Sequence, residues 1–202
     1  MLTRKASLTT VILAGGQGTR IGGDKGLQRL QGRALISWVV EAVKHDSEEI
    51  LISANESQDV YAKFGYRVIA DQRPGWLGPL AGLETALSVA QTDYVLSVPC
   101  DTPFLPKDLI ARLLEAQTAH AADACVVQVA GHRQPAIALY RKTVLPDLRA
   151  YLETGGRKVG GWLDSLHLSE VVFEHESDFD NINTQEELAR ANQVLIKMLR
   201  KH

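Results

Sequence analysis

Val11-Ile12-Leu13-Ala14-Gly15-Gly16-Gln17-Gly18-Thr19-Arg20-Ile21-Gly22-Gly23-Asp24-Lys25 is the stretch that decides the fold of this chain. It opens inside an apolar run, Thr10 to Ala14, whose length and β-branched content are typical of a buried strand. The glycines that follow have no Cβ, so consecutive backbone amides can turn toward an anion. Arg20 and Lys25 add full positive charges. The stretch predicts a strand followed by a loop that binds nucleotide phosphates, against the alternative of a flexible surface loop that binds nothing.

Two commoner kinds of glycine-rich loop do not fit. A Walker loop requires Gly-Lys-Ser/Thr at the start of a helix, but Lys25 stands between an aspartate and a glycine. A dinucleotide-binding loop would have glycine or alanine at the position of Ile21 and an acidic residue at the end of the second strand. Ser53, Ala54 and Asn55 stand at that end instead.

Several motifs of the loop resemble one enzyme superfamily. Leu13-Ala14-Gly15-Gly16, Arg20-Ile21-Gly22 and Asp24-Lys25 are similar to the signature of nucleotidyltransferases with a Rossmann-like fold. The Gly-x-Asp-Lys ending resembles the molybdenum cofactor guanylyltransferases in particular, since sugar-phosphate nucleotidyltransferases and cytidylyltransferases usually carry Pro-Lys there. The resemblance spans almost the whole chain, and it implies that Leu13, Ala14, Gly15 and Gly16 contact the nucleotide.

Composition places the chain among globular proteins. With 202 residues, 45% of them hydrophobic, it can bury roughly 70% of its unfolded surface. We expect one domain over residues 1–202, with a nucleotide-binding part at about 8–105 and an acceptor-binding part at about 106–202. The net charge of −2 gives no reason to expect nucleic acid or an anionic membrane as a partner.

The chain carries no sign of membrane insertion or export. No apolar segment approaches the ~20 residues that span a bilayer, and the apolar run after Arg4-Lys5 leads into the glycine loop rather than a cleavage site. Cys100 and Cys125 are expected as small buried hydrophobic residues rather than as a disulfide or metal pair. These features favour the cytoplasm.

Alternating strands and helices predict an α/β fold with a mostly parallel sheet covered by helices on both faces. In such sheets the ligand crevice lies beyond the carboxyl ends of the strands, and the glycine loop, Asp71 and Asp101 all follow strand ends. The expected strands are 10–14, 49–53, 66–70, 94–98, 124–129 and 136–140, and the expected helices are 34–44, 80–90, 105–118 and 184–199.

Asp101 ends the most hydrophobic strand, in Val98-Pro99-Cys100-Asp101-Thr102-Pro103-Phe104-Leu105. A carboxylate beside a triphosphate loop suits Mg²⁺, which takes one or two carboxylates together with phosphates and water. Capping of the next helix is the alternative, although two prolines separate Asp101 from the helical spacing. The segment also resembles the family's Pro-Cys-Asp-x-Pro-Phe element, which implies that Asp101 holds magnesium.

Gly78-Pro79-Leu80-Ala81-Gly82 follows Asp71 and begins a helix. Gly82 either lets a flat ligand approach the backbone or relieves crowding where helix and sheet cross. The run resembles the family's Gly-Pro-Leu-Ala-Gly, which implies contact with the guanine base from Gly78 and Gly82. Ser53 stands where the family commonly has an asparagine; strand alternation puts Asn55 on the same side, so Asn55 could take over that contact.

The later segments are expected to form the acceptor side. Asn181 and Asn183 alternate with Ile182, so both amides face one way while Ile182 faces the core. Thr184 and Glu187 have the spacing of a capping box. The run resembles the family's Asn-x-Asn-Thr element, and by that analogy Asn181, Asn183, Arg157 and Lys158 hold the pterin phosphate. An ordinary solvated pair is an equal alternative for Arg157 and Lys158.

Together these features predict transfer of GMP from GTP to the terminal phosphate of molybdenum-bound molybdopterin, with Arg20, Lys25 and Asp101 as the catalytic residues and Mg²⁺ as cofactor. No histidine lies in a motif loop, and a phosphate nucleophile needs charge neutralisation rather than a general base. Molybdoenzymes or cofactor-insertion proteins are candidate protein partners. Another Mg²⁺-dependent nucleotidyltransferase (cytidylyl or sugar-1-phosphate) and a non-catalytic nucleotide-binding adaptor are the alternatives.

Overall fold

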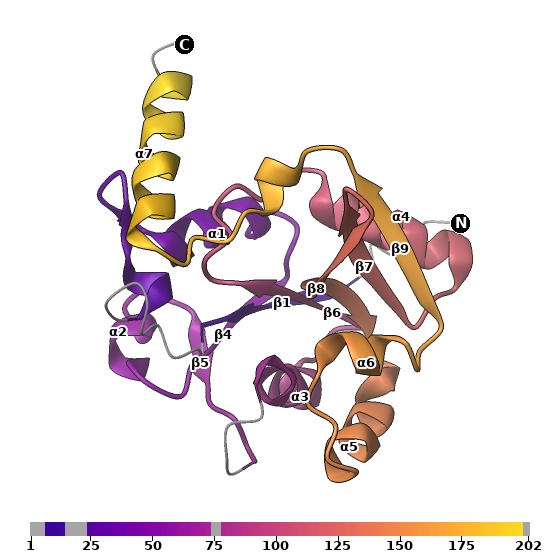
Figure 1. Cartoon of the computed structure of the whole chain (residues 1–202). Coiled ribbons are helices and arrows are strands. Elements are labelled where there is room, and N and C mark those ends of the chain that lie inside the picture. Colours follow the sequence, from indigo (N-terminus) through magenta and orange to yellow (C-terminus); the bar gives the residue numbers. More distant parts are fainter. Residues whose placement is uncertain (1–6, 15–23, 74–77, 200–202) are drawn as a thin grey trace.

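The computed structural model describes residues 7–14, 24–73 and 78–199. Within these residues the chain forms a seven-stranded sheet in the order β5-β4-β1-β6-β8-β7-β9, with helices on both faces (Figure 1). The strands of this sheet are β1 (Leu8–Leu13), β4 (Glu49–Ser53), β5 (Arg67–Ile69), β6 (Tyr94–Pro99), β7 (Ala124–Val129), β8 (His132–Arg141) and β9 (Leu168–Phe173). The helices are α1 (Leu35–Val43), α2 (Gln58–Ala62), α3 (Pro79–Val89), α4 (Leu109–His120), α5 (Leu145–Glu153), α6 (Val159–Leu163) and α7 (Gln185–Leu199).

The expected mostly parallel sheet is confirmed, with one reversed strand. β5, β4, β1 and β6 run parallel to one another, and β7 runs parallel to β9, whereas β8 is antiparallel to both β6 and β7. The reversal follows from the chain between β7 and β8, which is a tight turn through Ala130 and Gly131, both with positive φ. A turn with positive φ at both central residues has a backbone twist that matches the twist of the two hairpin strands. Pro135 lies where the register between β7 and β8 shifts. Proline has no backbone N–H to donate, and at this irregular position the sheet does not lose a regular hydrogen bond.

The core has a layer on each face of the sheet. Successive side chains of β1 point to opposite faces, so Ile12 packs with α1 and α4 on one side and Val11 packs with α3 on the other. In Figure 1, α1 and α4 lie above the sheet, and α3, α5 and α6 lie below it. Burial on both faces explains why β1 carries no charged residue, and its two threonines are buried with its apolar residues.

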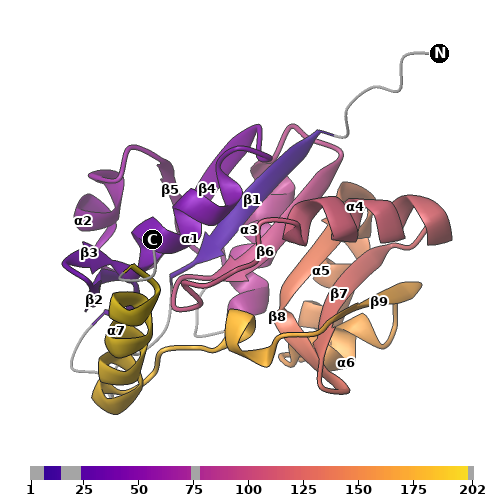
Figure 2. The same ribbon diagram turned by 90° about the horizontal axis from the view of Figure 1, so that it is seen from above.

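A third, smaller core fastens the C-terminal helix. The chain makes a short hairpin of β2 (Arg29–Leu30) and β3 (Arg33–Ala34) just before α1. Leu30, Leu35 and Ile182 pack there against Leu188 and Ala191 of α7. Figure 2 shows α7 beside this hairpin, standing off the sheet. The packing brings the segment before α7 across to the N-terminal half of the fold.

Several elements differ from the expected ones. The helix expected from residue 105 begins at Leu109, because Pro103 and Pro106 keep the preceding residues out of the helical conformation. α2, α5, α6 and β9 were not expected. α5 has Pro at its start and buries Leu148 and Leu152, a helical spacing that the sequence carries. No helix among the described residues is long and apolar enough to cross a membrane.

Candidate active site

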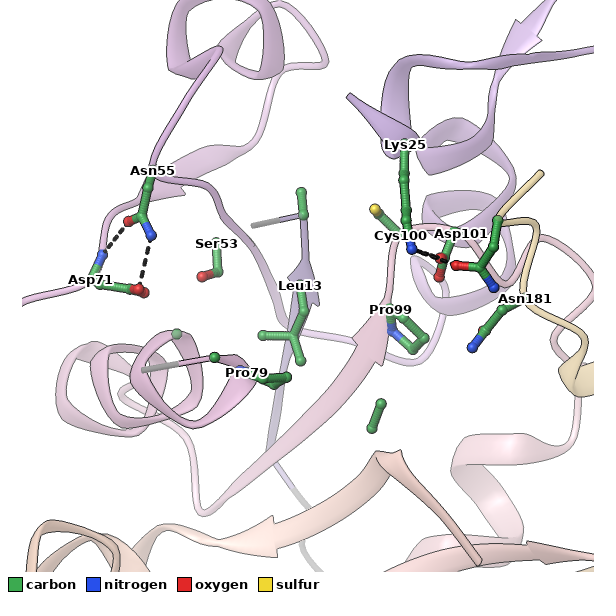
Figure 3. A pocket seen from close by; sticks show the side chains of 15 residues that line it. Leu13, Lys25, Ser53, Asn55, Asp71, Pro79, Pro99, Cys100, Asp101 and Asn181 are labelled. Atoms are coloured by element: carbon green, nitrogen blue, oxygen red, sulfur yellow. Dashed lines mark hydrogen bonds and ion pairs between the residues drawn. The ribbon is translucent and has the colours of Figure 1, made fainter. Parts of the chain in front are cut away.

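The carboxyl ends of three parallel strands meet at one pocket. Leu13 of β1 is the register partner of both Ser53 of β4 and Pro99 of β6, so the three residues end their strands side by side. A pocket of about 220 Å³ opens above them (Figure 3). It is lined by Leu13, Ala14, Lys25, Ser53, Asn55, Asp71, Gly78, Pro79, Gly82, Pro99, Cys100, Asp101, Ala136, Asn181 and Asn183. This is the crevice that the strand order of an α/β sheet predicts.

Lys25 and Asp101 face each other across this pocket. The Lys25 Nζ atom lies 3.4 Å from Asp101 Oδ2, and it also donates a hydrogen bond to Asn183 Oδ1. Asp101 is 6% exposed. Burial raises the pKa of the Asp101 carboxyl above its ordinary value, and the Lys25 ammonium opposes that rise. The loop lysine and the aspartate after the central strand therefore meet as the sequence predicts.

Asp101 has the chemistry of a ligand for a divalent cation such as Mg²⁺. Its buried carboxylate is a hard oxygen ligand in a pocket, and its raised pKa reflects a desolvated anion for which a cation would compensate. Among the described residues no group of three or more His, Cys, Asp or Glu could hold a metal ion by itself. Capping does not explain Asp101, because the N-cap of α4 is Asp108.

The side of the pocket formed by β4, β5 and α3 carries two further polar groups. Asn55 and Asp71 hold each other: Asn55 Nδ2 donates to Asp71 Oδ2 over 2.8 Å, and the Asp71 backbone N–H donates to Asn55 Oδ1 over 2.9 Å (Figure 3). Ser53 and Asn55 both line the pocket, as strand alternation predicts. The two hydrogen bonds hold these side chains together as a polar edge of the pocket.

Gly82 is explained by crowding. A Cβ at this position would lie 2.3 Å from Ser53 Oγ and 3.3 Å from Leu13 Cδ2. The glycine therefore lets α3 approach the ends of β1 and β4, which favours the packing alternative while leaving Gly82 on the pocket wall. Gly78 has positive φ at the N-cap of α3, directly before Pro79. Contact of either glycine with a base stays a prediction.

The segment before α7 is tied to the loop that carries Asp101. The Ile182 N–H donates to the Asp101 carbonyl over 2.9 Å, and Thr102 Oγ1 donates to Asn181 Oδ1 over 2.6 Å. Ile182 is buried while Asn181 and Asn183 line the pocket, which confirms the predicted alternation.

The capping box at the start of α7 is also confirmed. The Thr184 N–H donates to Glu187 Oε2 over 3.0 Å and the Glu187 N–H donates to Thr184 Oγ1 over 3.1 Å. These bonds fix the end of the segment that carries Asn183.

The structure does not bring Arg157 and Lys158 to the pocket. Arg157 Nη1 donates to the carbonyls of Leu152 and Gly156 over 2.9 and 2.6 Å, so its guanidinium caps the end of α5. Lys158 is exposed, and its carbonyl accepts a bond from Tyr151. Their role in holding the acceptor stays a prediction. Gly15, Gly16 and Arg20 lie outside the described residues.

The two cysteines and the described histidines lie in environments without evident catalytic chemistry. Both cysteines are buried free thiols. Burial raises the pKa of each thiol, so neither is poised to act as a thiolate. The histidines that the structure describes are exposed, and none lines the pocket.

Some pocket residues were not anticipated. Pro79, Pro99, Cys100 and Ala136 line it as well. The motifs 78–82 and 98–105 were the available signal for the first three, whereas Ala136 lies within β8 and in no motif. A second, larger cavity of about 790 Å³ lies between α7 and the loop from Pro103, and it shares Asn181 with the pocket. It does not contain Lys25 or Asp101.

Comparison with known proteins points in one direction. Residues 10–168 match the family described as MobA-like NTP transferase domain. A protein of Shewanella sp. (strain MR-4) named molybdenum cofactor guanylyltransferase is 43% identical over 185 residues, covering 91% of this chain and 94% of that protein. One of the same name from Shewanella baltica (strain OS155 / ATCC BAA-1091) is 41% identical over 194 residues, covering 95% and 99%.

Solved structures share the fold. Molybdopterin-guanine dinucleotide biosynthesis protein A from Archaeoglobus fulgidus superposes with a TM-score of 0.78 at 24% identity, covering 94% of this chain and 99% of that one. A CMP:2-keto-3-deoxy-manno-octonic acid synthetase complexed with CTP gives a TM-score of 0.76 at 13% identity, covering 96% and 100%.

Proposed function

Because the chain belongs to the MobA-like NTP transferase family, we propose that it is a molybdenum cofactor guanylyltransferase. It transfers GMP from GTP to the terminal phosphate of molybdenum-bound molybdopterin and yields the guanine dinucleotide cofactor and pyrophosphate. The observation that carries this proposal is the meeting of Lys25 and Asp101, 3.4 Å apart at the strand ends of a nucleotidyltransferase fold.

The chemistry needs positioning and charge neutralisation. A phosphate oxygen of the acceptor forms a bond to the α-phosphorus of GTP, and the bond from that phosphorus to the bridging oxygen of the β-phosphate breaks. A phosphomonoester has its second pKa near ~6, so the nucleophile is already ionised at neutral pH. No proton has to be removed, which agrees with a pocket whose described lining residues include no histidine.

Each pocket residue has a role in this scheme. Lys25, together with Arg20 of the glycine loop, holds the β- and γ-phosphates and neutralises the leaving pyrophosphate. Asp101 would hold Mg²⁺, and the ion would supply positive charge to offset the negative charge that develops as the bond breaks. Ser53, Asn55 and Asp71, with the start of α3, form the edge that receives the nucleoside.

The acceptor belongs on the side of the pocket formed by Asn181 and Asn183. Both amides can donate to phosphate oxygens. The bond from Lys25 to Asn183 supports a role for the lysine at the border between the two substrates. Arg157 and Lys158 are further candidates for the acceptor phosphate. Four points remain predictions. They are the separate roles of these residues, the split into nucleotide and acceptor parts, the cytoplasmic location, and a protein partner that receives the product.

The experiment supplies the purified protein with Mg²⁺, an acceptor (molybdenum-bound molybdopterin or a sugar 1-phosphate) and GTP, CTP, UTP or ATP in turn. We expect pyrophosphate release and a dinucleotide of the correct mass with GTP. Transfer with CTP or with a sugar phosphate as acceptor would identify a different nucleotidyltransferase. GTP binding, seen as a rise in melting temperature without any pyrophosphate release, would identify an adaptor.

A further inference from the structure

Tyr61 is a buried tyrosine with a polar partner next to the active site. It lies on α2, is 0% exposed and does not line the pocket. Its hydroxyl donates a hydrogen bond to Asp24 Oδ1. Burial and the neighbouring Asp24 carboxylate raise the pKa of Tyr61, so the hydroxyl keeps its proton and remains a donor.

Asp24 controls the turn that carries Lys25. It is the N-cap of the 3-10 turn Lys25–Leu27, and its carbonyl accepts the Leu27 N–H over 3.2 Å. Its side chain makes no cap bond to this turn. The Asp24 carboxylate is therefore engaged by α2 instead, which links the turn to a helix 37 residues further along the chain.

The turn is closely packed around Gly26, where there is no room for a Cβ atom. A Cβ on Gly26 would lie 2.6 Å from the Tyr61 hydroxyl oxygen and 3.2 Å from both Cβ and Sγ of Cys100. Cys100 directly precedes Asp101. The turn is thus packed between Tyr61 and Cys100. This packing determines where the backbone of Lys25 lies relative to Asp101.

We propose that Tyr61 is a positioning residue for guanylyl transfer: through its hydrogen bond to Asp24 it holds the Lys25 turn against Cys100, so that the ammonium reaches the phosphates and Asp101 together. This inference rests on the proposed function. A lysine has a long flexible side chain, so the place its charge can reach depends on where its backbone is fixed. A displacement of about 1 Å in such a group can cost ~10²-fold in rate.

The test compares Tyr61→Phe with Tyr94→Phe in steady-state pyrophosphate release, well below the melting temperature of each variant. Both substitutions remove one hydroxyl and keep the ring. The Tyr94 hydroxyl donates to Gln117 Oε1 over 2.8 Å, and Tyr94 lies at the end of β6 that is farther from Asp101. We expect Tyr61→Phe to lower kcat by about 10- to 100-fold with KM for GTP changed by less than about 3-fold. Tyr94→Phe should stay within about 2-fold of the unaltered protein.

Asp24 variants separate positioning from general stability. Asp24→Asn keeps an oxygen that accepts the Tyr61 hydrogen bond, so it should retain more activity than Asp24→Ala. Adding Tyr61→Phe to Asp24→Ala should lower kcat no further. Equal kcat for Tyr61→Phe and Tyr94→Phe, or a full additional loss in the Asp24→Ala background, would overturn the inference. Lack of transfer by the unaltered protein would refute the proposed function instead, so the two failures can be told apart.

Discussion

Replacing Asp101 by asparagine separates the catalytic value of this residue from its effect on stability. The two side chains have nearly the same shape, so the change removes one charge from a site that is 6% exposed. Loss of one preorganised electrostatic group typically costs ~10²–10³-fold in kcat, or roughly 2.7–4 kcal/mol of transition-state stabilisation. We expect a loss of that size in Asp101→Asn, because the neutral amide is a poor ligand for the magnesium ion.

Stability should move in the opposite direction. The pKa of Asp101 is raised in the folded protein because burial outweighs the attraction of Lys25. A carboxyl with a raised folded pKa destabilises the fold once pH exceeds its unfolded pKa, and the full cost is present above the folded pKa. Asp101→Asn removes that cost, so its melting temperature at neutral pH should equal or exceed that of the unaltered protein.

The assay follows pyrophosphate release at saturating GTP and acceptor while Mg²⁺ is varied, with melting curves recorded in parallel. Glu84→Gln is the control, since Glu84 is 5% exposed and lies outside the pocket. Glu84 is paired with Arg73 and Arg149 at 2.7 and 3.4 Å. This control should keep its turnover and lose about 1–2 kcal/mol of stability, less than a fully buried pair because both arginines retain contact with water. Near-normal turnover of Asp101→Asn at saturating Mg²⁺ would refute the metal assignment.

Three further substitutions test the packing and charge around the site. Gly82→Ala should lower the free energy of unfolding by about 1–3 kcal/mol, because its Cβ would lie 2.3 Å from Ser53 Oγ; denaturant titration should show that Ser53→Ala restores part of the loss. Gly26→Ala should reduce kcat by at least about 10-fold, and a kinetically normal variant would contradict the tight seat of the lysine turn. Glu187 accepts backbone N–H bonds that lower its pKa below the ordinary value, so its stabilising contribution is present above the unfolded pKa and is lost as pH falls through the folded one. Melting temperatures measured from pH 7 down to about 3 should therefore show Glu187→Gln below the unaltered protein at neutral pH and equal to it in acid.

The sequence predicted the parts of the site that depend on strand ends and local spacing. Apolar runs located β1 and β6, and a parallel sheet then requires the residues after them to share one edge. Lys25 and Asp101 could be paired in this way although they are 76 residues apart. Asn181 and Asn183 were predicted because alternation about a buried isoleucine is a local property.

Contacts that depend on how helices dock could not be read from the sequence. A tyrosine in a short helix looks like an ordinary core residue, so nothing indicated that Tyr61 would reach Asp24. α5 was not expected, so the sequence did not indicate that the Arg157 guanidinium donates to carbonyls at the end of that helix. The reversal of β8 depends on two positive-φ residues, one of them an alanine, which seldom adopts that conformation.

The bond between Lys25 and Asn183 joins residues 158 positions apart. A ribosome must therefore synthesise the 158 residues that follow Lys25 before both walls of the pocket can exist. During translation the emerging N-terminal strands already contain the lysine and then the aspartate, but the asparagines that complete the enclosure arrive last. A nascent chain therefore cannot complete this pocket before Asn183 has been synthesised.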